Sequence, residues 1–331
     1  MKSKKNPVAT GVFSCVVVAI LIFMVALMAM VMGSIQVTLV DVFKGLFMEY
    51  DKRVATIYDL RFPRILVSLM AGGALSASGL LFQSALRNPL ADPGIIGISG
   101  GAAFAAALVS ALFPMLYFSI PLFACLGGVV AYLLIYFLAW KGVLDPVRII
   151  LVGIAVAAVF SGLTSIFNSI SNRTGVSLTV SGLTQLVWSD VKLLAIYVSI
   201  GLVGALLLAP VCNIMALEDS TVRGLGIHVD VIRLIISGVA VILCAGVTAV
   251  VGVIGFLALV SPHMARRIVG NDHRILTPFT ILLGALLLLV ADTLGRTLFA
   301  PVEVSANILM NIIGGPFFIY LLRREASSGG G

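Results

Sequence analysis

The sequence predicts an all-α polytopic membrane protein with about ten transmembrane helices. Of its 331 residues, 60% are apolar and only 11% are charged, whereas soluble proteins carry about 25% charged residues. Eight stretches without a charged residue together cover 222 of the 331 residues, and a helix crosses a bilayer in about 20 residues. The 33 glycines are also typical of helices that pack closely in lipid. We therefore expect one transmembrane domain over residues 1–326, and a flexible tail or cloning remnant over 327–331.

The charge-free stretches indicate the individual spans in order. They lie at 6–40, 65–86, 93–140, 149–172, 193–217, 234–265, 275–291 and 304–322. The first stretch follows three lysines and is long enough to span, and no cleavage signal closes it, so it is expected to remain as the first helix. The stretch of 48 residues at 93–140 must hold two helices, with the turn between them at Pro114 and Pro121.

The stretch at 234–265 leaves the number of crossings open. As one straight helix its 32 residues would be about 48 Å long, which exceeds the hydrocarbon core, so it holds one helix or a broken pair. The choice gives nine or ten crossings. With ten, and the N-terminus inside, 13 of the 21 basic residues face the cytoplasm; with nine, only 9 do. Because basic residues concentrate on the cytoplasmic side, ten crossings are favoured, with both termini cytoplasmic.

Several functional classes are disfavoured by what the sequence lacks. Ion-coupled secondary transporters usually hold ionisable residues at mid-membrane depth, and the charge-free stretches supply none. No phosphate-binding loop, paired carboxylates or Ser/His/Asp spacing is present, so we expect no catalytic site. The four cysteines occur singly, which disfavours a metal or redox site. The net charge of +7 lies mostly in short loops, where it sets topology and does not indicate nucleic-acid binding.

Three polar islands interrupt the apolar sequence, and the first contains Arg61 and Arg64. These arginines precede the second span on the expected outer face, against the usual charge distribution. They are either interfacial side chains that extend toward water or a docking site for an acidic partner.

The second island, at 87–94, contains residues that interrupt regular helix, namely Asn88, Pro89 and Pro93, and Gly97 follows it. Irregular backbone at membrane depth is tolerated only where protein or a water-filled cavity satisfies its polar groups. This island is therefore either a structured break between two spans or a plain turn.

The third island, at 217–227, predicts a short helix outside the membrane. Glu218 and Asp219 suit its start and Gly226 suits its end. A short amphipathic helix of this kind either fits into a partner protein or is a solvated connector.

At these islands the chain resembles a known family, the permease subunits of ABC importers for iron–siderophore complexes, haem and cobalamin. The family pattern R-x-P-R matches Arg61–Arg64, and Q-x-x-x-x-N-P-L-A-x-P-x-x-L-G-x-S-x-G matches Gln83–Gly101, with isoleucine in place of the leucine before Gly97. Two further patterns match Ile254–Arg274 and Leu289–Arg296. The matches extend over about residues 55–322, and the resemblance implies a type II ABC importer permease with ten transmembrane helices.

The resemblance also implies partners. In that family two copies of the permease surround one translocation path, and outer arginines accept glutamates of an extracytoplasmic substrate-binding protein. The matching positions are Arg61, Arg64 and Arg296. The residues Asn88, Pro89, Pro93 and Gly97 belong to the shared structural motif, and Thr164, Ser165 and Asn168 are expected to face the path.

The resemblance assigns the cytoplasmic loop at about 217–230 to contact with a separate ABC ATPase dimer. The positions expected to couple it are Asp219, Val222, Arg223, Leu225 and Gly226. ATP and Mg would bind that ATPase, so this chain is expected to hold no cofactor and no metal. Ser220 and Val222 depart from the family's usual glutamate and alanine, which implies an ATPase adapted to this surface.

The expected function is therefore ATP-driven import of an iron compound, haem or a ferric siderophore, across the bacterial cytoplasmic membrane by alternating access. The spacing of the loop before Trp188 slightly favours haem. A cobalamin importer, and less so an ion-coupled secondary transporter, remain the alternatives.

Overall fold

The computed structural model describes residues 7–32, 41, 52–94, 96–139, 146–173, 182–184, 186–298 and 302–328. Residues used above that lie outside these ranges include the first three lysines, part of the loop before Trp188 and the last three glycines. The described residues form helices and turns, with no strand among them. The α-helices are α1 Pro7–Val31, α3 Lys52–Leu86, α4 Ile98–Leu112, α5 Ile120–Ala139, α6 Pro146–Arg173, α7 Trp188–Met215, α8 Asp219–Gly224, α9 Val229–Val251, α10 Leu257–Val269, α11 His273–Thr297 and α12 Ala306–Ser328.

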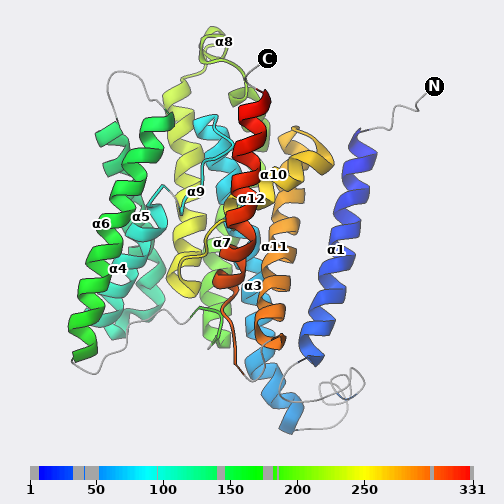
Figure 1. The fold of residues 1–331 in the computed structure, drawn as a ribbon, viewed down its shortest axis with the longest axis vertical. Coiled ribbons are helices and arrows are strands. Elements are labelled where there is room, and N and C mark those ends of the chain that lie inside the picture. Colours follow the sequence, from blue (N-terminus) through cyan, green and yellow to red (C-terminus); the bar gives the residue numbers. More distant parts are fainter. Residues whose placement is uncertain are drawn as a thin grey trace.

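The helices other than α8 run up and down one bundle (Figure 1). α1 begins and α12 ends at the end of the bundle where α8 lies, which is the top of Figure 1. Seven of the described helices are long and apolar enough to cross a membrane, and α4 and the first part of α12 are shorter apolar helices. With α10 they make ten helices besides α8 in the described chain, which agrees with the expected number of about ten, and the stretch at 234–265 holds a broken pair of helices, α9 and α10.

Two interruptions divide the long apolar stretches. A 3-10 turn at Pro114–Ser119 separates α4 from α5, near the two prolines that predicted a turn there. Residues 252–256 separate α9 from α10, and the lower end of α9 lies within the bundle, above the lower ends of α6 and α11 (Figure 1). Gly252 and Phe256 have positive φ there, of 83° and 61°. The backbone N–H of Gly255 donates to Asn307 Oδ1 of α12 at 3.1 Å, which supplies a partner that the broken helix lacks.

α3 lies at the centre of the bundle, and its most apolar stretch is 83% buried, against 11% for α1 and 17% for α6. The reason is the small size of its side chains, because α3 is rich in alanine, serine and glycine through its middle. Gly72 lies against the backbone of Gly284 in α11, and Gly79 lies against the carbonyl of Ala258 in α10. α1 and α6 instead expose large apolar side chains, as expected for helices that face lipid or another subunit.

The segment between α3 and α4 is irregular but ordered by its own side chains. Asn88 Oδ1 accepts from the N–H of Leu90 at 2.8 Å, and Asp92 Oδ1 accepts from the N–H of Gly94 at 2.7 Å. Gly97 has a φ of 91°, and a Cβ there would lie 2.9 Å from the carbonyl oxygen of Gly153 in α6. A side chain at this position would therefore strain the backbone and also separate α4 from α6.

Candidate functional site

The candidate site has two parts at opposite ends of the bundle, and the first is an arginine cluster. Arg61 and Arg64 lie in the early part of α3, and Arg296 lies in the last turn of α11. The two helices meet there because α3 begins and α11 ends at the end of the bundle away from α8 (Figure 1). The three positions that sequence reasoning assigned to docking are thus brought together in space.

Arg64 is bound to two carboxylates from other parts of the chain. Its Nε donates to both oxygens of Asp292, at 2.9 and 3.1 Å, and its Nη2 donates to Asp292 Oδ1 at 2.9 Å. Its Nη1 donates to Glu303 Oε2 at 2.8 Å. The Arg64 and Asp292 side chains are 8% and 2% exposed, whereas that of Glu303 is 47% exposed. Arg64 therefore balances a buried carboxylate inside the protein and meets the surface only through Glu303.

Arg61 and Arg296 bind the C-terminal end of α1. Arg61 Nη1 donates to the carbonyl oxygen of Met30 at 2.6 Å, and Arg296 Nη2 donates to the carbonyl oxygen of Ala29. The last carbonyls of a helix have no partner within the helix, and they form the negative end of its dipole. The two guanidinium groups donate to these carbonyl oxygens and place positive charge at the negative end of the helix dipole. They also attach α1, which lies at the edge of the bundle, to α3 and α11.

The second part is α8, at the other end of the bundle. The side chain of Val222 is buried, whereas that of Leu225 is 62% exposed. Arg223 is also exposed and lies 3.8 Å from the exposed carboxylate of Asp230. Gly226 has a φ of 78°, and no other atom would lie within 4 Å of a Cβ placed there. Val222 therefore anchors α8, while Arg223, Leu225 and Gly226 form a surface that faces outward.

Asp219 at the start of α8 faces the bundle. Its carboxylate accepts from Arg233 Nη2 at 2.9 and 3.1 Å and from Arg87 Nη1 at 3.3 Å. Arg233 Nε donates to the carbonyl oxygen of Ala85 in α3 at 3.0 Å. Sequence reasoning used Arg233 only to count charges and placed Arg87 at the start of the second polar island. Their positions beside helix ends, just after α3 and near the start of α9, were the signal for this contact.

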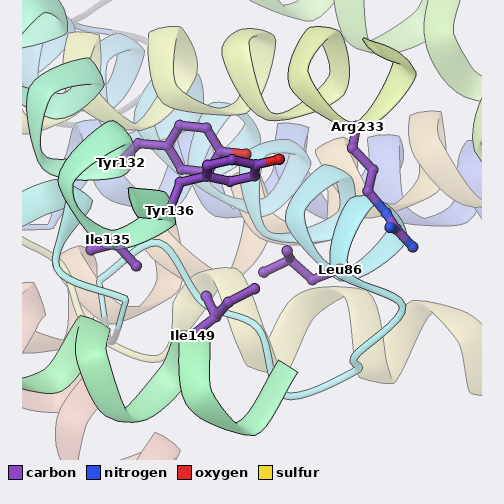
Figure 2. A pocket seen from close by; sticks show the side chains of 6 residues that line it. All are labelled: Leu86, Tyr132, Ile135, Tyr136, Ile149 and Arg233. Carbon is purple, nitrogen blue, oxygen red and sulfur yellow. The ribbon is translucent and has the colours of Figure 1, made fainter. Parts of the chain in front are cut away.

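A pocket lies beside Arg233 (Figure 2), with an empty volume of about 310 Å³ that includes space open to solvent. Its lining is almost wholly apolar. Figure 2 shows the rings of Tyr132 and Tyr136 on one side and the side chains of Arg233 and Leu86 on the other. The pocket is thus lined by side chains of α3, α5, α6 and α9. Its full lining is Leu86, Tyr132, Ile135, Tyr136, Ile149 and Arg233.

A second polar cluster at this end joins three helices. The ring of His273 lies 2.8 Å from Ser84 Oγ and 2.9 Å from Asn213 Oδ1. Asn213 Nδ2 donates to Asp272 Oδ1 at 2.7 Å, and this bond lowers the pKa of Asp272 below its usual value, as does the N–H of Arg274. Because the His273 ring is buried and Ser84 also hydrogen-bonds its own helix, the cluster ties α3, α7 and α11 together.

The three positions expected to face the path lie on α6. Thr164 and Ser165 hydrogen-bond carbonyl oxygens one turn earlier, at 2.8 and 2.9 Å. Asn168 Oδ1 has no hydrogen-bond partner among the described residues. Small polar groups therefore occur on a helix that is otherwise apolar and largely uncovered. No group of three or more metal-ligating side chains occurs in the described part of the chain.

A bundle built mainly of long apolar helices, with a short polar helix at one end and a buried charge network at the other, is that of an integral membrane protein. A model of the FecCD transport family matches residues 19–324. The chain belongs to the FecCD transport family. The resemblance indicated by the sequence motifs is thereby confirmed.

Relatives and solved structures agree with this assignment. The chain is 39% identical over 310 residues to the "Probable heme-iron transport system permease protein IsdF" of Staphylococcus aureus strain Newman, which covers 94% of both chains. The same protein of strain MSSA476 gives the same identity and coverage. An inward-facing metal-chelate type ABC transporter matches with a TM-score of 0.79 and 25% identity, over 95% of this chain and 99% of that one. PsaBC of Streptococcus pneumoniae, with a TM-score of 0.55 and 14% identity over 86% and 95% of the two chains, shares the fold.

Proposed function

We propose that this chain is the transmembrane permease subunit of an ATP-driven importer that moves an iron compound, haem or a ferric siderophore. The observation that carries the proposal is its 39% identity, over 94% of both chains, to a permease named for haem-iron transport. That likeness favours haem over a siderophore and gives cobalamin or an ion gradient no support.

The proposed assembly contains two copies of this chain, a cytoplasmic ATPase dimer that binds ATP and Mg, and an extracytoplasmic substrate-binding protein. The α8 end would face the cytoplasm, so that both termini lie there. The uncovered face of α6 suits a second copy, and pairing would place Thr164, Ser165 and Asn168 beside the path. Closure of the ATPase dimer would displace α8 and switch the path between its two openings.

The test of this function is growth of a deletion strain in iron-limited medium, with haem or a ferric hydroxamate siderophore as the sole iron source. We expect growth to be lost on haem alone and restored by the gene on a plasmid. Loss of growth on the siderophore alone would show that the substrate is a ferric siderophore and not haem. No loss on either source, in a strain without other iron importers, would refute iron import and lead to a test of labelled cobalamin uptake.

The exposed surface of α8 predicts a specific defect in assembly. Leu225→Glu places a charge on a 62% exposed apolar side chain that would be buried against the ATPase, so the ATPase subunit should be lost from the purified complex. The matched control is Val302→Glu, which alters a 65% exposed side chain near the other end of the bundle and should retain it. Stoichiometric ATPase in the Leu225→Glu complex would contradict the coupling role.

The arginine cluster predicts how the binding protein associates. Arg61→Gln should lower its association rate with the complex in nanodiscs by about tenfold at low salt, because opposite charges steer encounter. Arg61→Lys should retain most of the association rate. The difference in rate between the parent and Arg61→Gln should shrink as salt is added, because salt screens the charges. Arg64 is unsuited to this test because it balances a buried carboxylate, whereas Arg61, although it is also buried, donates to uncharged carbonyl oxygens of α1. Equal rates for the parent and a folded Arg61→Gln complex would refute docking at this residue.

A further inference from the structure

The coupling helix α8 is too short to hold its position alone. It has six residues, and isolated helices shorter than about 12 residues are unstable in water. Among its described contacts, Val222 supplies the buried apolar one, and Asp219 supplies the shorter ion pairs to Arg233 and Arg87. Arg223 also lies 3.8 Å from Asp230 of α9, but both side chains are exposed, and such pairs contribute little. The direction in which α8 moves the bundle therefore depends mainly on what Val222 and Asp219 contact.

Asp219 is bound to two transmembrane helix ends at once. Its Oδ1 lies 2.9 Å from Arg233 Nη2, in the first turns of α9, and 3.3 Å from Arg87 Nη1, just after α3. Arg233 also donates through Nε to the carbonyl oxygen of Ala85, at 3.0 Å, which is among the last four carbonyls of α3. One carboxylate and one guanidinium group therefore link α8, α9 and α3. α3 is the central helix of the bundle.

The pocket in Figure 2 lies between this linked group and the neighbouring helices. Arg233 and Leu86 belong to the linked helices, whereas Tyr132, Tyr136 and Ile149 belong to α5 and α6. Beside the pocket, Phe82 of α3 packs against Tyr132 of α5, with ring centroids 6.1 Å apart, so a displacement of α3 would be felt by α5 as well.

We propose that Asp219 is a positioning residue that transmits displacement of α8 to α3 and α9 through Arg87 and Arg233, and that it is not a contact for the ATPase. The proposal deepens the proposed function and rests on it. It divides the loop by role. Arg223 and Leu225 face outward to bind the ATPase, and Asp219 faces inward to convert that binding into movement of the bundle.

The test uses the complete importer in proteoliposomes, with its ATPase and binding protein. Asp219→Asn removes the charge that holds the two arginines but keeps the size of the side chain. We expect the ATPase to co-purify at full stoichiometry and its hydrolysis rate to stay within about twofold, while substrate moved per ATP falls at least about tenfold. Loss of the ATPase subunit would make Asp219 a direct contact, and unchanged substrate per ATP would also overturn the proposal.

Three further variants make the test specific. Glu218→Gln removes the same charge one residue earlier, on an exposed side chain, and should leave substrate per ATP unchanged. Arg233→Lys keeps the charge opposite Asp219 but cannot also bond the Ala85 carbonyl as a guanidinium does, so an intermediate loss is expected. The double variant Asp219→Asn with Arg233→Gln should be no worse than the more damaging single change, because both act through one link. Additive losses would show two separate roles and contradict the proposal.

These outcomes are distinct from failure of the proposed function. If the unaltered importer hydrolyses ATP but moves neither haem nor a ferric siderophore, the proposed substrate class is wrong, and Asp219 is not in question. If the unaltered importer moves its substrate and Asp219→Asn moves as much per ATP, only the role of Asp219 is refuted.

Discussion

Replacing Arg64 by alanine is expected to lower the apparent free energy of unfolding by about 3–5 kcal/mol, because it leaves the buried carboxylate of Asp292 without its partner. Asp292 is 2% exposed, and both of its carboxylate oxygens accept hydrogen bonds from that guanidinium group. The measurement is the thermal unfolding midpoint of the purified permease in detergent, together with the yield of monodisperse protein.

Two controls separate this buried pair from a surface one. Glu303→Gln removes the partner that is 47% exposed, and exposed ion pairs contribute about 0–1 kcal/mol, so a small change is expected. Replacing both buried partners by apolar residues, as in Arg64→Met with Asp292→Leu, should recover most of the lost stability. A midpoint for Arg64→Ala equal to that of Glu303→Gln would show that the pair is not buried as described.

A second large effect is expected at the centre of the bundle, where Gly79→Val should prevent α3 and α10 from packing. A Cβ at Gly79 would overlap the backbone carbonyl of Ala258, and backbone cannot move aside as a flexible side chain can. Overpacking typically costs about 1–3 kcal/mol and more where backbone must shift, so we expect little folded protein.

The matched control for Gly79 is Gly238, in the interior of α9, where no other atom would lie within 4 Å of an added Cβ. Gly238→Val tests the same change of residue type in a transmembrane helix without the clash, and it should melt close to the parent. Equal unfolding midpoints for the two variants would contradict the close approach of α3 and α10.

Much of the fold could be predicted from the sequence because membrane helices have a strong compositional signal. The stretches without a charged residue located most of the transmembrane helices. The distribution of basic residues favoured a broken pair of helices in the ambiguous stretch at 234–265, and the structure has α9 and α10 there. The end of α8 was predicted, because Gly226 follows the last helical residue and its cap with a φ of 78°. The end of α12 was not, because α12 continues to Ser328, two residues into the expected tail.

The partners of the charged side chains could not be predicted, because they come from distant parts of the chain. Arg64 and Asp292 are separated by 228 positions, and Arg87 and Asp219 by 132. Each arginine has a local pattern that places it near a helix end, but no local pattern tells whether its guanidinium group faces water, a helix end or a carboxylate. Sequence reasoning placed these arginines near helix ends; it could not find that Arg61 and Arg296 bind the end of α1.

The break between α9 and α10 has a consequence for how the chain enters the membrane. The N–H of Gly255 is paired by Asn307, a side chain that leaves the ribosome 52 residues later. Until α12 is made, the turn at 252–256 holds an amide that lipid cannot satisfy, and α10, with 13 residues, is too short to cross by itself. The pair α9–α10 is therefore expected to remain beside the insertion machinery and to leave it together with α11 and α12, so that the last four helices enter the bilayer as one unit.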